Sequence, residues 1–227
     1  MSQEHDTQTA FMEATYRALC TYGYADLTMQ DIADETDKSK AALHYHFDGK
    51  DDLFREFLAY LHEGFAETIA DHPEGTPVER LVALVRRVLE PVDDSADQQF
   101  NTAFMEIKAQ APYREGYREV LRRFDGDLRT EVADLVREAI EDGQYDEATD
   151  PEVIAEHVVT YIHGTWTRAA AVGVDVVATR EHLVDDLLDL LVEDASVPVD
   201  ETDGRASDAG DADGLPGNDS EDVEGLE

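Results

Sequence analysis

Three of the four lysines in this 227-residue chain, Lys38, Lys40 and Lys50, fall within thirteen positions of one another. The chain as a whole is strongly acidic, with 54 Asp and Glu against 18 Lys and Arg and a formal charge of -36. Lysine ammonium groups bind phosphate oxygens and can pair with the O6 and N7 atoms of guanine. Positive charge concentrated at one place in an acidic protein therefore predicts a negatively charged partner there, and DNA is the first candidate.

The acidic excess extends over every segment of the chain, and 14 of the 18 basic residues are arginine. Such an even distribution is not a nucleic-acid footprint. It indicates a surface adapted to a cytoplasm of molar salt, where charged groups stay hydrated and their repulsion is screened. A hydrophobic content of 42%, placed with helical periodicity, argues against disorder over most of the chain.

Nothing in the chain predicts a membrane span or an export signal. It has no run of about 18 apolar residues, and its first ten residues, MSQEHDTQTA, lack the basic and apolar regions of a signal peptide. We therefore expect a cytoplasmic protein. Its single cysteine, Cys20, excludes an intrachain disulfide and is interpreted as a small buried hydrophobe.

The segment that carries the lysines predicts a helix-turn-helix. A first helix over about residues 7–22 ends at Gly23, and a short second helix over about residues 29–35 begins with a capping box formed by Thr28 and Asp31. After a turn of about three residues, Ser39 is a favourable N-cap for a third helix that ends near His46. Two short helices joined by such a turn can place the second one in the major groove of DNA.

Apolar periodicity predicts helices throughout the rest of the chain, so the expected fold is all-α. Thr76-Pro77 and Asp150-Pro151 are cap-and-proline helix starts, and Thr179 is predicted to begin the last helix. The further helices are expected over about residues 50–70, 77–91, 95–110, 112–142, 151–172 and 179–194. The predicted domains are a DNA-binding domain (1–49), a helical regulatory and dimerisation domain (50–194) and a disordered acidic tail (195–227), which is rich in Asp, Glu, Gly, Ser and Pro.

The entering helix of the predicted motif offers Ser39, Lys40, Ala42, His44 and Tyr45 on its first turn and exposed face. Lys40 is predicted to read guanine, and Ala42 suits a thymine methyl group. The start of the helix after Thr28 suits a phosphate. Lys50 begins a long helix, where a cation gains nothing from the helix dipole, and we expect an external anion as its partner.

The segments TYGYADLT, MQDIADE, SKAALHYHF and DGKDDL resemble the TetR family of transcriptional regulators over about residues 9–58. Asp37 and Lys38 stand where the family usually has Gly and Val, and His44 replaces a phosphate-contacting Tyr, although Tyr45 follows at once. The resemblance implies that the DNA contacts fall on Thr28, Gln30, Lys40, Ala42, His44, Tyr45, His46 and Lys50.

The resemblance also implies a C-terminal domain that forms a homodimer and encloses a small-molecule effector. The run HGTWTRAA at residues 163–170 is similar to the BetI/AcrR-like subset of the family. Aromatic or polar-tipped side chains on helices expected to face one another are the candidate ligand residues, and Glu106 would suit a cationic ligand if it pointed inward. These candidates are Phe100, Phe104, Tyr113, Tyr117, His157, Tyr161 and Trp166.

The last predicted helix has a broad apolar face, wider than a terminal helix normally covers alone. A two-fold dimer would bury it and place two reading heads on adjacent major grooves, about 34 Å apart, which requires a palindromic operator. The candidate dimer residues are Leu183, Val184, Leu187, Leu188 and Leu191.

Three functions remain open from the sequence. The leading hypothesis is a homodimeric repressor that a small-molecule effector releases from a double-stranded DNA operator. The second is a ligand-independent regulator or an activator. The third is a helical enzyme, but the chain has no nucleophile elbow, phosphate-binding loop or dinucleotide fingerprint. We expect no catalytic residue, no cofactor and no metal site, since the side chains of His44 and His46 diverge on a helix.

Overall fold

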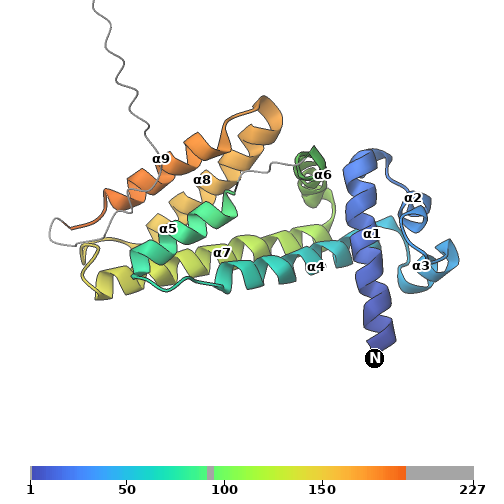
Figure 1. The fold of residues 1–227 in the computed structure, drawn as a ribbon, viewed down its shortest axis with the longest axis horizontal. Coiled ribbons are helices and arrows are strands. Elements are labelled where there is room, and N and C mark those ends of the chain that lie inside the picture. The colour runs from blue at the N-terminus through green and yellow to red at the C-terminus, as the bar shows by residue number, and fades with distance from the viewer. Residues whose placement is uncertain (1, 91–94, 193–227) are drawn as a thin grey trace, which may run out of the picture. The chain divides into compact units, whose positions relative to one another are not determined.

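The computed structural model describes residues 2–90 and 95–192, and this part of the chain is helical (Figure 1). In chain order, the segment predicted to form the helix-turn-helix comes first and the further helices follow. The helices are α1 (Ser2–Asp26), α2 (Met29–Asp34), α3 (Lys40–His46), α4 (Lys50–Ala70), α5 (Pro77–Val88), α6 (Ser95–Gln110), α7 (Glu115–Glu141), α8 (Pro151–Val172) and α9 (Val176–Leu188), with a 3-10 turn η1 (Ala111–Tyr113) before α7. The all-α fold predicted from the sequence is confirmed.

The predicted helix starts are present at the level of individual hydrogen bonds. Thr28 and Asp31 form a reciprocal capping box at the start of α2, and Thr76 and Glu79 form another at the start of α5. The Ser39 hydroxyl accepts a hydrogen bond from the backbone N–H at position 42 (3.1 Å). These caps satisfy N–H groups that have no partner within a helix.

The last helix differs from its prediction at both ends. It begins at Val176 because Asp175, rather than Thr179, is its N-cap and accepts hydrogen bonds from two backbone N–H groups (2.9 and 3.2 Å). Thr179 instead lies inside the first turn, where its hydroxyl donates to the Asp175 carbonyl (2.7 Å). The helix ends at Leu188, and the chain then pairs with the segment after α7 through a bridge between Tyr145 and Leu191.

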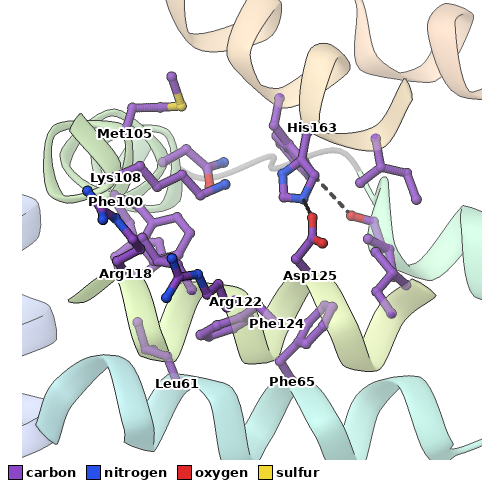
Figure 2. A pocket seen from close by; sticks show the side chains of 17 residues that line it. Leu61, Phe65, Phe100, Met105, Lys108, Arg118, Arg122, Phe124, Asp125 and His163 are labelled. Atoms are coloured by element: carbon purple, nitrogen blue, oxygen red, sulfur yellow. Dashed lines mark hydrogen bonds and ion pairs between the residues drawn. The ribbon is translucent and has the colours of Figure 1, made fainter. Parts of the chain in front are cut away.

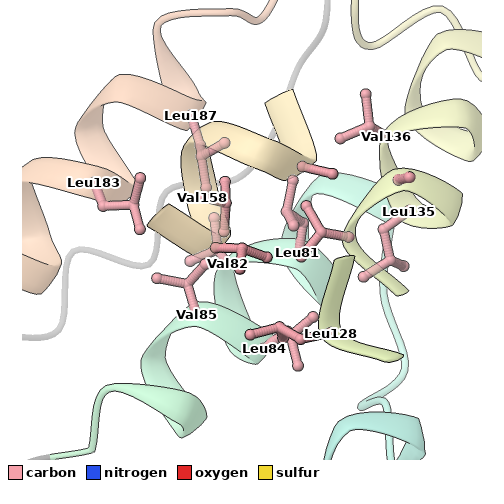
Figure 3. Packing of buried hydrophobic residues seen from close by; sticks show 14 of the residues in the cluster. Leu81, Val82, Leu84, Val85, Leu128, Leu135, Val136, Val158, Leu183 and Leu187 are labelled. Atoms are coloured by element: carbon pink, nitrogen blue, oxygen red, sulfur yellow. The ribbon is translucent and has the colours of Figure 1, made fainter. Parts of the chain in front are cut away.

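Two hydrophobic cores hold the helices together. One joins α1, α2, α3, the first half of α4, α6 and the start of α7, and it includes Phe54 and Tyr117. The other joins α5, the rest of α7, α8 and α9, and Figure 3 shows part of its packing. The long helices α4 and α7 pack along each other and contribute to both cores.

The first core contains residues from both sides of the predicted boundary between residues 49 and 50. The ranges of the three predicted domains stay predictions. The predicted disordered tail at 195–227 lies outside the described residues. Among the helices that the structure describes, none combines the length and the apolar character that crossing a bilayer requires.

Candidate DNA-binding surface and ligand cavity

Helix α3 is anchored by its apolar side and exposes its polar side. Leu43 and Phe47 are buried, and the Phe47 ring packs edge-on against Phe11 of α1. Ser39 and Lys40, at the N-terminal end, are exposed, as are His44 and Tyr45, and Tyr45 is 85% exposed. The buried side of α3 is therefore fixed in the core, and the candidate base-reading residues lie on the opposite side, in solvent.

Lys40 differs from the other two lysines of the motif in having no internal partner. It is exposed, and it makes no hydrogen bond or ion pair with the residues that the structure describes. Lys38 instead forms an ion pair with Asp37 (3.2 Å), as expected if it only offsets neighbouring acidic residues. Lys40 is thus the lysine of the motif whose charge is available to an outside partner.

Three other candidate DNA residues have contacts within the protein. The His46 ring packs 5.6 Å from that of Phe11 and is partly buried, and Ala42 is also partly buried. The Gln30 amide donates to Asp34 (2.7 Å) on the exposed side of α2. The Gln30 amide keeps its oxygen and a second N–H for an outside partner, and the DNA contacts of Gln30, Ala42 and His46 stay predictions.

The start of α2 carries a negative charge beside the predicted phosphate site. The Thr28 hydroxyl and backbone N–H both donate to the Asp31 carboxylate (2.6 and 2.8 Å), and these bonds lower the pKa of Asp31. A phosphate bound here would therefore meet the remaining free N–H groups of the first turn and not the Thr28 N–H.

Lys50 points into the protein. Its ammonium group donates to the carbonyl oxygens of Tyr24 and of Leu27 (2.7 Å for Leu27) and lies 4.4 Å from the centre of the Tyr24 ring. Burial is the largest cause that lowers the pKa of Lys50. The ammonium group of Lys50 therefore has partners within the protein, and it does not need an external anion. A DNA contact by Lys50 stays a prediction.

A cavity of about 590 Å³ lies among α4, α6, α7 and α8, with the end of α5 at its side (Figure 2). Its wall is mostly aromatic and aliphatic, as in sites for small organic molecules. The lining residues are Leu61, Phe65, Val88, Phe100, Asn101, Phe104, Met105, Lys108, Arg118, Leu121, Arg122, Phe124, Asp125, Leu128, Ile162, His163 and Trp166.

The structure brings three of the seven candidate ligand residues to this cavity. Phe100 and Phe104 stack with ring centres 5.8 Å apart, and the Trp166 indole N–H donates to the Val88 carbonyl (3.2 Å). Each of these contacts holds an aromatic side chain in a defined position at the wall.

The other four candidates lie elsewhere. Tyr113 is 85% exposed and His157 is also exposed. Tyr117 is buried in the first core with its hydroxyl 3.3 Å from that of Tyr24. Tyr161 donates to the Thr179 carbonyl (3.0 Å), so it orders the start of α9 and does not pair with His157.

The sequence interpretation missed most of the polar groups of the cavity. Lys108, Arg118, Arg122, Asp125 and His163 all line it. Lys108 could have been recognised, because it follows Phe104 by four residues and so lies on the same side of a helix. The arginines and Asp125 carry no such signal, since their spacing equals that of a solvated helix face.

Glu106 faces away from the cavity and binds the end of α1. Its Oε2 atom accepts hydrogen bonds from the backbone N–H groups of Tyr24 (2.8 Å) and Ala25 (3.3 Å). Gly23 permits the backbone conformation just before these N–H groups, because its φ of 69° lies in the left-handed region that favours glycine. Helix α6 therefore contacts the reading head on one side and lines the cavity on another.

The candidate dimer residues pack within the chain itself. Leu183, Val184 and Leu187 are buried in the second core, between α9 and the helices α5 and α8 (Figure 3), and Leu188 and Leu191 pack against the same core. The apolar stripe that suggested a dimer surface is thus covered by the chain's own helices. Leu188 and Leu191 stay partly exposed, and a dimer contact by the five candidate residues stays a prediction, as does homodimerisation.

Two protein families match the chain. Residues 11–57 match the bacterial regulatory proteins of the tetR family, and residues 77–193 match the C-terminal domain of BetI-type transcriptional repressors. The first match covers the helix-turn-helix, and the second covers α5 to α9 together with most of the cavity wall.

Solved structures agree with these matches. A TetR transcription regulator from Haloarcula marismortui is 35% identical, with 83% of this chain and 100% of that chain covered and a TM-score of 0.76. A protein from Saccharomonospora viridis, described as a transcriptional regulator and crystallised with choline, is 23% identical, with 83% and 99% covered and a TM-score of 0.71. A comparison with curated proteins found no match.

Proposed function

Because the chain belongs to the TetR family, with a BetI-type C-terminal domain, we propose that it is a homodimeric repressor released from a palindromic operator by a small molecule. The family establishes the coarser statement that the chain is a DNA-binding transcriptional regulator and not an enzyme. Homodimerisation, repression and effector release are the proposed parts.

The observation that carries the proposal is the double role of α6. Phe100 and Phe104 of this helix form part of the cavity wall, while Glu106 holds the backbone of Tyr24 and Ala25 at the end of α1. A ligand that displaces α6 must either move the reading head or break these two hydrogen bonds. In a dimer, either change alters the spacing of the two heads, which must match adjacent major grooves.

The cavity also favours a ligand-responsive regulator over a ligand-independent one. An effector needs a mostly apolar pocket that lies beside an element in contact with the DNA-binding helices. Here about 590 Å³ is present within the described part of the chain, and it lies beside the helix that contacts the head. The choline in the Saccharomonospora relative supports the binding of a small molecule, and the identity of the effector is a separate question.

The proposal is tested first on DNA. Genome-wide mapping of bound sites, followed by footprinting with the purified chain, should give a palindrome whose half-sites are about 34 Å apart, with two chains per operator. Deleting the gene should raise transcription from the bound promoter. A fall in transcription would contradict repression, and one chain bound to a single half-site would contradict the dimer.

The role of α6 is tested by Glu106→Gln, which keeps the shape of the side chain and removes its charge. This variant should still bind the operator, but an effector should change its operator affinity less than it changes that of the wild type. Glu63→Gln is a matched control, because Glu63 is exposed on α4 and has no partner among the described residues. Equal effector responses in the wild type and both variants would contradict coupling through Glu106.

A further inference from the structure

The fourth lysine of the chain, Lys108, faces the cavity without a counter-ion. It lies on α6 across the cavity from His163 and Asp125 (Figure 2), and no carboxylate of the described residues lies within ion-pair distance of its ammonium group. Its one specific contact is with the Phe104 ring, 4.9 Å from the ring centre. Burial is the largest cause that lowers the pKa of Lys108, and the charge of Asp125 offsets part of this effect.

The two arginines of the cavity already have a carboxylate partner, whereas Asp125 lies near His163 and also acts on Lys108. Arg118 and Arg122 both bind Glu115 at one rim (3.1 and 3.0 Å). Asp125 lies 3.3 Å from the Nε2 atom of His163, at ion-pair distance but without hydrogen-bond geometry. Lys108 is therefore the cation of the cavity that makes no hydrogen bond or ion pair with the described residues, and the charge of Asp125 acts on it only from beyond ion-pair distance.

The balance of charge at the cavity is opposite to that of the chain. Three of its lining residues, Lys108, Arg118 and Arg122, are basic and one, Asp125, is acidic, whereas acidic residues outnumber basic ones three to one in the sequence. Burial and the nearby charge of Lys108 also lower the pKa of His163. A second positive charge placed here would be repelled, and a negative charge would be stabilised.

A quaternary ammonium ligand fits this cavity poorly. Such ligands bind over the faces of aromatic rings, but the ammonium group of Lys108 already lies over Phe104 and would repel a second cation bound at the neighbouring rings. A neutral ligand would displace water and leave the lysine less hydrated and still unpaired, which is costly in an apolar site. An anion supplies the missing partner and makes a charge-assisted hydrogen bond with it.

We propose that the effector is an amphipathic organic anion whose carboxylate pairs with Lys108 while its apolar body lies against Phe104, Phe124 and Trp166. The inference rests on the proposed function, in which this cavity receives the effector. It deepens that function by assigning the chemical class of the ligand, and it distinguishes this chain from its choline-bound relative.

Three series of probes with the same body and different charge test the proposal. They are phenylalkanoates from phenylpropanoate to phenylhexanoate, the phenylalkanols of equal length, and the corresponding phenylalkyltrimethylammonium ions, with choline added. Binding is followed by the fluorescence of Trp166, the one tryptophan of the chain, which lines the cavity. Measurements in molar potassium chloride screen long-range attraction, so any preference reports short-range contacts.

The wild type should bind the anions more tightly than the alcohols and the ammonium ions. Lys108→Met removes the charge and keeps the apolar stem, so anion affinity should fall by about 30-fold or more, as for the loss of one partner of a buried charge pair. Affinity for the alcohols should stay equal or rise. Lys108→Arg should keep the preference for anions, and Lys40→Met, the same charge change at an exposed site, should not alter it.

A wild type that prefers the alcohols or ammonium ions, or that binds none of the series, overturns the proposal. Anion affinity unchanged in Lys108→Met overturns it too, and a urea melt of that variant verifies that it is folded. The readout uses the chain without DNA. Anions that bind as expected and leave operator affinity unchanged would contradict the proposed function, while the assignment of the cavity would stand.

Discussion

Replacing Lys50 with methionine tests whether this lysine stabilises the fold or contacts DNA. In the structure its ammonium group donates to two carbonyl oxygens, of Tyr24 and Leu27, at the junction of α1 and α2. Methionine keeps an apolar stem beside the Tyr24 ring and removes both donors. The expected result is a less stable fold, because two carbonyl groups lose a partner.

The size of the effect follows from these contacts. A hydrogen bond from a charged group contributes about 1.5–3 kcal/mol, and the cation over the Tyr24 ring contributes about 0.5–1 kcal/mol. The cost of burying the ammonium group, which lowers its pKa, offsets part of this sum. We therefore expect Lys50→Met to lower the free energy of unfolding by about 2 kcal/mol.

Urea unfolding in molar potassium chloride measures this change. With a slope of about 2 kcal/mol per molar urea, the midpoint should fall by about 1 M. Protein concentration is held constant, because a dimer gains stability with concentration. Lys40→Met is the matched control: Lys40 is exposed and unpaired among the described residues, so its midpoint should not move, while its operator affinity should fall.

The opposite pattern would refute the reasoning. If Lys50→Met unfolds at the wild-type urea concentration and binds the operator weakly, the internal hydrogen bonds contribute little and Lys50 acts on DNA. If Lys40→Met weakens binding to all DNA sequences equally, Lys40 contacts phosphate and does not read a base. Footprints on the operator and on unrelated DNA distinguish the two kinds of contact.

Three further changes have defined outcomes. Tyr145→Phe removes a buried hydroxyl that donates to the Leu187 carbonyl (2.9 Å), so the melting temperature should fall by about 2–4 °C, and an unchanged melting curve would show the bond to be dispensable. Thr76→Ala removes half of the capping box at the start of α5 and should lower the free energy of unfolding by about 1 kcal/mol, whereas Thr76→Ser should restore it. Burial lowers the pKa of His163 below 6.5, so the folded chain binds fewer protons there than the unfolded chain, and stability should fall as pH drops through 6.5 toward the folded pKa. In urea melts over that range His163→Gln should lose less stability than the wild type, and equal losses would contradict the assignment.

The helix starts could be predicted because their signals are local. Thr28 and Asp31, or Thr76 and Glu79, satisfy N–H groups within four residues of themselves, and no distant part of the chain is needed. The same holds for Gly23, whose left-handed backbone ends the regular part of α1 where the sequence indicated a stop. The start of α9 differs from its prediction for an equally local reason, because Asp175 is a stronger N-cap than Thr179.

The cavity and the contacts between helices could not be predicted in this way. Periodicity shows which side of a helix is apolar, but it does not show which other helix covers that side. Leu183 and Leu187 illustrate this limit, since the same stripe suits a dimer partner or the chain's own α5 and α8. Glu106 illustrates it for a charge, since its partner is the backbone of a helix about eighty residues earlier.

The first core joins the helix-turn-helix segment to two of the helices that line the cavity. Ile107 of α6 and Val120 of α7 share that core with Phe11 of α1 and Leu43 of α3. In a chimera that joined residues 1–49 to the C-terminal helices of another regulator, the side chains of the shared core would no longer fit one another. The hydrogen bonds from the Tyr24 and Ala25 N–H groups to Glu106 would also be lost. We therefore expect substitutions on the solvent side of α3 to change DNA contacts at little cost in stability, whereas a change at one side of the shared core needs a matching change at the other.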